Sequence, residues 1–153
     1  MLFNSLKKSI AKVEQLVEKG NQNLQSGNNS SAMSNFRDAD KRIHKYKDKE
    51  KDLYSQVLVG LATCYYSDSN FEQAEKLYNE TLLLYKEVKN ENDPLIASCL
   101  NNLGAIYQST ERYELALDTY KKALSIARKN VDDNHPFVSR LKGYIQDVKG
   151  FMK

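Results

Sequence analysis

The sequence predicts an all-α protein whose helical hairpins stack into a right-handed solenoid. The 153 residues include only two prolines and six glycines, too few for the tight turns of an all-β chain. Apolar residues recur at helical spacings of three and four. These patterns return every 42 residues, which is the signature of a repeat architecture.

The 42-residue period aligns residues by size as well as by polarity. Three-way matches join Ala32, Ala74 and Ala116; Phe36, Tyr78 and Tyr120; Leu16, Leu58 and Leu100; and Gly20, Ala62 and Gly104. Chance is a poor explanation for agreement in three copies. One domain is expected over residues 1–153, with repeats at about 13–51, 52–93 and 94–135 and a capping helix at about 136–152.

Each repeat is expected to be a pair of helices. In the second repeat, Leu58, Leu61 and Tyr65 mark one apolar stripe, and a polar break at residues 67–70 separates it from a second stripe that starts at Phe71. A lone hairpin cannot bury both of its apolar faces, so neighbouring hairpins must stack.

Small residues and helix-start residues support this pairing. Gly104 and Ala116 are expected where two paired helices cross, because a bulky side chain there would force the helices apart. Asp93 and Asn134 are expected at helix N-termini, with Pro94 in a first helical turn.

The two ends of the chain differ in character. The last segment keeps a one-sided apolar stripe of Leu141, Tyr144, Ile145 and Val148, which suits a terminal capping helix with one polar face. Residues 1–13 combine apolar residues with lysines and have no acid before Glu14, somewhat like an amphipathic targeting segment. They lack arginine and run into a helical pattern, so we expect a first structural helix and leave a targeting role open.

Composition and motifs narrow the classes of protein. No apolar run approaches the ~18–20 residues that cross a bilayer, so no membrane span is expected. Cys64 and Cys99 align with apolar positions of the repeat, which predicts buried, unreactive thiols in a reducing compartment. His44 and His135 lie far apart in the repeat frame, and no motif assembles a nucleophile, a base and a stabilising group. We therefore expect no enzyme, no cofactor and no metal.

The third repeat reads Leu100-Asn101-Asn102-Leu103-Gly104-Ala105-Ile106-Tyr107, followed by Tyr113, Ala116, Tyr120 and Ala123. This pattern resembles the tetratricopeptide repeat (TPR), whose usual period is 34 residues. The longer period, the Asp93-Pro94 and His135-Pro136 connectors and the paired asparagines resemble the repeats of kinesin light chains. The first repeat departs most, with Lys19 and Asn23 where leucine and tyrosine are expected.

In such repeats the first helix of each hairpin lines a concave groove. The groove positions of this chain are expected to be Asn21, Gln56, Val59, Thr63, Tyr66, Ser98, Asn101, Asn102, Gln108 and Tyr144. Amides with small and aromatic groups suit an uncharged helix or an extended peptide of a partner protein. The resemblance to kinesin light chains implies that the amide of Asn102 holds the backbone of such a ligand.

Some TPR domains clamp the C-terminal carboxylate of chaperone tails with lysines, an arginine and asparagines. Asn21 matches one of those positions, but Val17, Gly60, Ser98 and Asn102 occupy the others. A carboxylate without a cationic partner is weakly held, so we expect no such clamp.

Charge is distributed unevenly around a net value of +3. A basic run holds Lys41, Arg42, Lys45, Lys47, Lys49 and Lys51. Cations at a helix C-terminus complement its dipole, which is the simpler interpretation. The alternative is a basic patch for an acidic protein surface or a phosphate backbone. Acids and a single aromatic residue within the run make nucleic acid the weaker choice.

Together these features predict a non-catalytic protein–protein interaction module, an adaptor or scaffold that binds a peptide or helix of a partner in its groove. One alternative is a small structural subunit of a larger assembly, packed through its outer faces. A second is a binder of acidic surfaces or nucleic acid through residues 41–51. We expect a cytoplasmic location, and a cytoskeletal or other large assembly is one setting for it.

Overall fold

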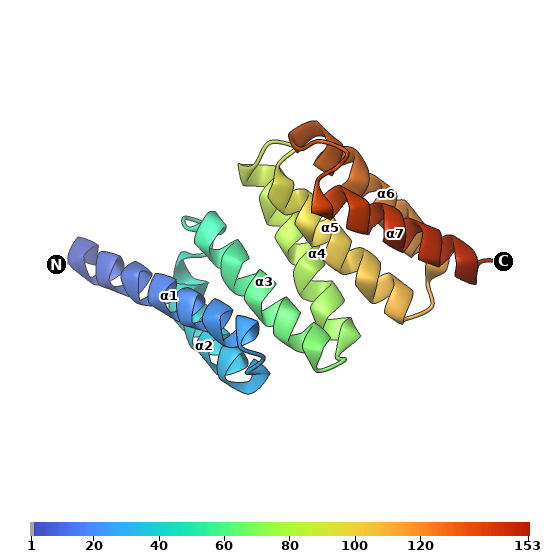
Figure 1. Ribbon diagram of the computed structural model, residues 1–153. Helices are drawn as coiled ribbons and strands as arrows, with labels where there is room; N and C mark the ends of the chain where they lie inside the picture. The colour runs from blue at the N-terminus through green and yellow to red at the C-terminus, as the bar shows by residue number, and fades with distance from the viewer. Residues whose placement is uncertain (1) are drawn as a thin grey trace. The chain divides into compact units, whose positions relative to one another are not determined.

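The computed structural model describes residues 2–153, with side chains from Asn4 onward. That range contains seven α-helices, one short 3-10 helix and no strand. The helices are α1 (Leu2–Gln25), α2 (Asn29–Ile43), η1 (His44–Tyr46), α3 (Lys51–Ser67), α4 (Phe71–Val88), α5 (Pro94–Ser109), α6 (Tyr113–Asn130) and α7 (Pro136–Phe151) (Figure 1). Met1 and the side chains of Leu2 and Phe3, part of the amphipathic N-terminal segment, lie outside the described part. No helix in residues 2–153 is long and apolar enough to cross a bilayer.

Contacts divide the chain into two compact units, with the boundary inside α4. The first ends at Leu84 and the second spans Tyr85–Lys153. In the first unit α1 and α2 form a hairpin, and α3 packs against both. In the second unit α5 and α6 form the equivalent hairpin, and α7 packs against α6 (Figure 1).

The aligned positions of the repeat are buried, as the 42-residue period predicts. Ala32, Ala74 and Ala116 are fully buried. The aromatic position carries Phe36, Tyr78 or Tyr120, and none of these is more than 2% exposed. Of the aligned leucines, Leu100 is the exception, since it is only half-buried. Each second helix therefore presents a small residue and an aromatic ring to the core.

Aromatic rings pack directly against glycines of the repeat, at positions where a side chain would collide with the ring. A Cβ atom on Gly104 would lie 2.6 Å from Cε1 of Tyr120, and one on Gly20 would lie 2.6 Å from Cζ of Phe36. A Cβ on Gly60 would also collide with the ring of Phe36. Gly104 thus lies where α5 packs against its partner helix α6, as predicted, and the neighbour that it admits is the ring of Tyr120.

The three hairpin turns share one backbone conformation that the sequence analysis did not identify. Gly27, Ser69 and Glu111 have positive φ angles of 73°, 59° and 59°. They are spaced by 42 residues, so each lies at the same place in its repeat. Each donates a backbone hydrogen bond to the carbonyl three residues earlier, at 2.9–3.1 Å. The following residue bonds to the carbonyl five residues before it, at 2.8 Å, which is the Schellman arrangement of a helix end.

Two helices begin with a capping side chain followed by proline. A carboxylate oxygen of Asp93 accepts a hydrogen bond from the backbone N–H of Leu95 at 2.9 Å, and Pro94 occupies the first turn of α5. At α7 the cap is His135, whose Nδ1 accepts from the N–H of Phe137 at 3.2 Å. The expectation that Asn134 begins this helix is therefore off by one residue, because proline at the first helical position places the cap immediately before it.

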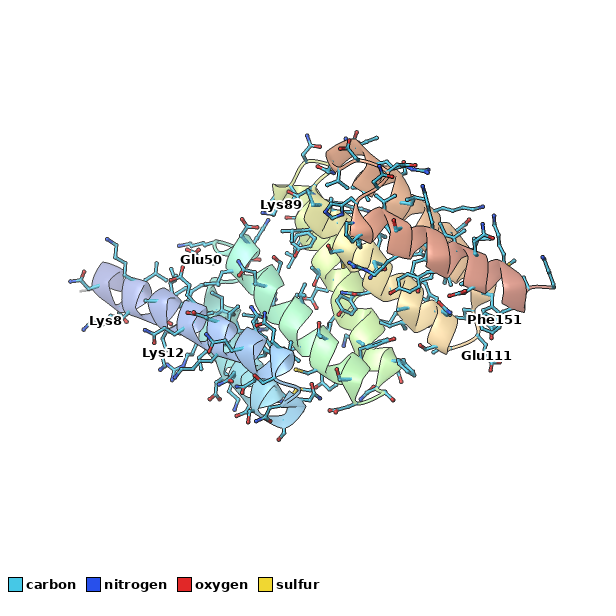
Figure 2. All side chains as sticks on the ribbon, viewed as in Figure 1. Lys8, Lys12, Glu50, Lys89, Glu111 and Phe151 are labelled. Atoms are coloured by element: carbon cyan, nitrogen blue, oxygen red, sulfur yellow. The ribbon has the colours of Figure 1, made fainter. Side chains whose placement is uncertain are left out.

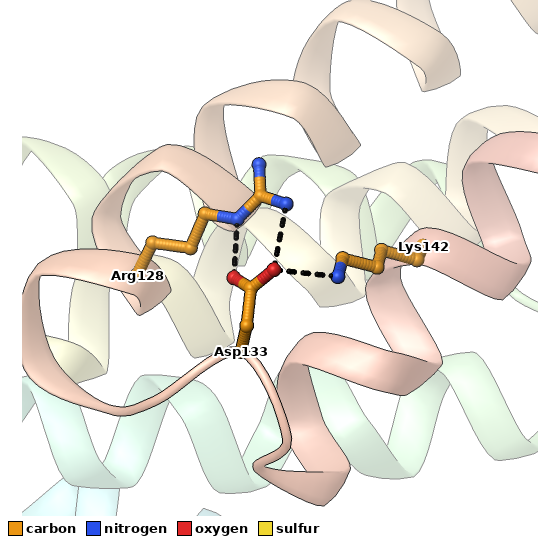
Figure 3. A network of polar contacts seen from close by, with 3 residues as sticks. All are labelled: Arg128, Asp133 and Lys142. Carbon is orange, nitrogen blue, oxygen red and sulfur yellow. Dashed lines mark hydrogen bonds and ion pairs between the residues drawn. The ribbon is translucent and has the colours of Figure 1, made fainter.

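A three-residue ion network ties α6 and α7 to the connector between them (Figure 3). The carboxylate of Asp133 accepts hydrogen bonds from Nε of Arg128 and Nζ of Lys142, each at 2.8 Å. These hydrogen bonds, that from Arg128 first, lower the pKa of Asp133 to about 2. All three side chains are solvent-exposed, so the network orients the connector and adds little stability.

Helix α7 has the two-faced character of a terminal cap. Its buried side is formed by Val138, Leu141, Ile145 and Val148. Ser139, Arg140, Gln146 and Lys149 are exposed. At its end the ring of Phe151 stacks on Tyr113, with centroids 5.3 Å apart, beside the turn that carries Glu111 (Figure 2).

Candidate functional site

The first unit contains an open groove between α1 and α3. It has a volume of about 610 Å³, and none of its lining residues comes from α2. Two predicted groove residues, Asn21 on α1 and Gln56 on α3, line this space together. Both side chains are exposed, so their amides are available to a ligand.

The other predicted positions on α3 are half-buried and partly engaged within the unit. The hydroxyl of Thr63 donates its proton to the carbonyl of Val59 at 2.8 Å. The hydroxyl oxygens of Tyr78 and Thr63 lie 2.9 Å apart in a second hydrogen bond, in which either hydroxyl can donate. Tyr66 meets Phe71 edge to face, with centroids 5.6 Å apart. Thr63 therefore anchors the buried tyrosine of α4, while Tyr66 supports the start of α4.

In the second unit, two predicted positions surround the buried ring of Tyr120. The amide oxygen of Gln108 accepts a hydrogen bond from the Tyr120 hydroxyl at 3.1 Å. The ring of Tyr144, on α7, lies 5.3 Å from the Tyr120 ring between centroids. Tyr78 and Tyr120 align in the repeat but use different partners, because Ala105 stands where Thr63 stands one repeat earlier.

The paired asparagines of α5 are half-buried neighbours, and Ser98 is exposed. Nδ2 of Asn101 lies 3.5 Å from Oδ1 of Asn102, a long contact that a ligand could replace. Oδ1 of Asn101 is buried without a hydrogen-bond partner. The predicted residues thus form two sets, one in each unit, and a single groove that joins both sets stays a prediction.

The basic run does not lie on one continuous helix. Lys41 and Arg42 end α2, Lys45 lies in η1, Lys47 and Lys49 lie in the following turn, and Lys51 begins α3. Nζ of Lys45 lies over the ring of Tyr46, 4.7 Å from its centroid. Lys41 lines a second cavity of about 620 Å³ together with Arg37, Asp38 and Asp68. The cations are therefore divided among several local environments.

The cysteines match their predicted environment. Cys64 and Cys99 are buried free thiols, no more than 2% exposed. Burial raises the pKa of Cys64 to about 11 and that of Cys99 to about 12, so the thiolate is scarce at neutral pH. Among the residues the structure describes, no group of three or more His, Cys, Asp or Glu side chains is placed to hold a metal ion.

The carboxylates of the α1–α3 groove are the site residues that sequence reasoning largely missed. Glu14 and Glu18 on α1, and Glu50 and Asp52 at the start of α3, all line it. Glu14 is a groove position in the repeat frame, but the basic composition of residues 1–51 hid the acidic character of this face.

Comparison with known proteins assigns the family. The tetratricopeptide repeat profile matches residues 53–129, half of the chain. The chain belongs to the tetratricopeptide repeat family. A comparison with curated protein sequences found no match.

Solved structures share the fold at low sequence identity. BtubC (BKLC) from P. vanneervenii is 19% identical with a TM-score of 0.74, over 96% of this chain and 66% of that one. A putative kinesin light chain with TPR-like repeats from Podospora anserina is 14% identical with a TM-score of 0.79, over 91% of this chain and 66% of that one. This chain therefore spans just under two thirds of both proteins. The first TPR of Spaghetti (RPAP3), bound to an HSP90 peptide, is 16% identical with a TM-score of 0.67, over 93% of this chain and 96% of that one.

These likenesses confirm the predicted fold class, an all-α solenoid of helical hairpins with TPR-like repeats. They also confirm the predicted resemblance to kinesin light chain repeats, now at the level of structure. At 14–19% sequence identity, these similarities establish the fold and do not identify a partner.

Proposed function

We propose that the chain is a non-catalytic interaction module, an adaptor or scaffold that holds a peptide or helix of a partner protein along its first helices. The observation that carries the proposal is the open groove between α1 and α3, which Asn21 and Gln56 line together. Membership of the tetratricopeptide repeat family supports the same role. In the first unit the partner lies against α1 and α3, where this groove is open.

The polar chemistry of α5 suits a peptide backbone. An asparagine amide offers one acceptor and two donors, which match the N–H and C=O groups of an extended strand. Among the described side chains, the one that contacts the Asn102 amide is Asn101, at 3.5 Å, so a ligand replaces this contact at little cost. Asn102 is the residue proposed to hold the partner's backbone.

A carboxylate clamp of the kind used for chaperone tails is not part of the proposal. Two of the positions where cations or amides would be needed carry Val17 and Gly60. Val17 is 4% exposed, and a Cβ atom on Gly60 would already meet the ring of Phe36. Neither position has space for a long polar side chain that reaches a ligand.

The test is affinity capture from cell extract with the wild-type chain and with the double variant Asn102→Ala/Tyr66→Ala. Less of the co-purifying partner is expected on the variant, which should stay folded by circular dichroism but melt at a lower temperature, because the contact of Tyr66 with Phe71 is lost. The control is Lys121→Ala/Lys122→Ala, two exposed positions on α6. Wild-type capture by Asn102→Ala/Tyr66→Ala would contradict the role of these two residues and favour a structural subunit packed through its outer faces.

A further inference from the structure

The groove between α1 and α3 is lined by acids and contains no cation. Its charged lining residues are Glu14, Glu18, Glu50 and Asp52, and neither lysine nor arginine is among the others. Residues 1–51 hold 11 lysines and arginines against 6 acids, so the groove is opposite in sign to the segment that builds most of it. On α1, the acids and most of the lysines lie on different faces.

The geometry of α1 explains the separation. At 100° per residue, Lys8, Lys12 and Lys19 lie about 120–160° around the helix from Glu14, so they face away from the groove. Lys7 shares the angular position of Glu14 to within about 20°, but it lies two turns earlier and is not a lining residue. Figure 2 shows Lys8 and Lys12 along one edge of α1, and Glu50 at the start of α3. Three of the four lysines of α1 therefore lie on a different face from the groove acids, and the fourth lies beyond the first lining residue, Ile10.

The groove carboxylates on α1 have little compensation inside the protein. Where the structure describes side chains, no salt bridge involves Glu14, Glu18 or Glu50. Glu18 accepts one long hydrogen bond, 3.4 Å from Nε2 of Gln22. Glu50 and Asp52 lie at the N-terminus of α3, where the helix dipole favours negative charge. Glu14 and Glu18 lie in the middle of α1 and lack that compensation, so their charges are the ones most available to a ligand.

An apolar floor accompanies the acids. Val17 and Leu53 line the groove and are 4% and 8% exposed, and Ile10 is half-buried. The α1 residues that line it run from Ile10 to Gln25, about 22 Å at the helical rise of about 1.5 Å per residue. That length fits roughly four turns of a helix or about seven extended residues. A ligand therefore needs apolar side chains toward the floor and charge along its flanks.

We infer that this groove selects a cationic amphipathic segment of a partner protein, with lysines or arginines on either side of an apolar stripe. The inference rests on the proposed function and adds the charge of the partner to it. Charge complementarity sets the partner's orientation and raises its rate of encounter. It reverses the expectation of an uncharged ligand for this part of the chain.

The experiment measures fluorescence anisotropy with three labelled fifteen-residue amphipathic peptides. They share one apolar stripe and carry lysine, glutamine or glutamate on the polar face. The lysine peptide is expected to bind most tightly and the glutamate peptide least. The affinity of the lysine peptide is expected to fall when the salt concentration rises from about 50 to about 300 mM, because screening weakens the attraction between exposed charges.

Matched variants test the site. The double variant Glu14→Gln/Glu18→Gln is expected to lower the affinity for the lysine peptide by about 2- to 30-fold, which is the range expected for the loss of two exposed charge pairs. Glu114→Gln/Asp118→Asn makes the same change in net charge at exposed positions four residues apart on α6. That control is expected to keep wild-type affinity. Equal weakening by both variants would overturn the inference, because net charge alone would then explain binding.

The remaining outcomes separate the charge inference from the proposed function. If the glutamine and lysine peptides bind equally well, the charge inference fails and a groove for peptides survives. If no peptide binds and capture is also indifferent to Asn102→Ala/Tyr66→Ala, the proposed function fails as well. A salt-sensitive dimer in sedimentation, abolished by Glu14→Gln/Glu18→Gln, would assign the groove to a second copy of the chain and overturn the assignment to a partner.

Discussion

Replacing Gly104 by alanine is expected to destabilise the second unit, although alanine is the better helix former. The new Cβ atom would lie 2.6 Å from Cε1 of Tyr120. Carbon atoms in contact prefer about 3.5–4.0 Å, so either the ring or the α5 backbone must move by about 1 Å. The ring has little freedom, because it is 1% exposed, its hydroxyl is bonded to Gln108, and Tyr144 packs against it.

The expected magnitude is the difference of two terms. Overpacking of a buried site costs about 1–3 kcal/mol. The gain in helix propensity from glycine to alanine is about 1 kcal/mol. The net loss is therefore up to about 2 kcal/mol, or a fall in Tm of about 4–8 °C at roughly 2–4 °C per kcal/mol for a chain of this size.

Gly143→Ala provides the matched control in the same unit. Gly143 lies inside α7, and a Cβ atom there would meet nothing within 4 Å. Only the propensity term applies, so this variant is expected to gain about 0.5–1 kcal/mol. Urea unfolding followed by far-ultraviolet circular dichroism measures both variants, and their difference isolates the overpacking cost. Equal stabilities would refute the argument that the glycine admits the Tyr120 ring.

Three further outcomes are expected. Ser69→Gly and Glu111→Gly should each raise the free energy of unfolding by about 0.5 kcal/mol, because glycine removes the cost of a left-handed backbone; a lower Tm would contradict this. Cys64 and Cys99 should resist a thiol reagent at pH 8, below their raised pKa values of about 11 and 12, and should react in urea; rapid native labelling would count against burial. Because the folded-state pKa of Asp133 is lowered to about 2, its stabilising contribution is present above the ordinary value of 3.8 and disappears as pH falls through 2. Any difference in the free energy of unfolding between wild type and Asp133→Asn should therefore disappear as the pH is lowered from about 3.8 to about 2.

The fold was predictable because packing constraints repeat along the chain. Positions such as Ala32, Ala74 and Ala116 tolerate only small residues, so the period is visible in residue size. The left-handed turns were not visible in the same way. Gly27 favours a positive φ, but Ser69 and Glu111 do not, and no local preference marks them. Their conformation is imposed by the two helices that they connect.

The charge of the candidate groove was harder to predict than its residue positions. The repeat frame identifies Asn21 and Gln56 as groove positions, but a sum over residues 1–51 is basic. The sign of a surface depends on which side of a helix each charge occupies, and Lys12 and Glu14 fall on different sides although they are two residues apart. Contacts such as that of the Tyr78 hydroxyl with Thr63 depend on side-chain geometry that spacing does not specify.

The turns at Gly27, Ser69 and Glu111 also bear on how such a chain changes in length. If the chain between two of these residues is removed or duplicated, the residues on either side of the new junction have the same backbone conformation as before. Duplication or deletion of 42 or 84 residues between these points leaves every hairpin bend intact, whereas a length that is not a multiple of 42 leaves one bend with too many or too few residues. The three positions are therefore natural breakpoints for recombination, at which whole hairpins can be gained or lost.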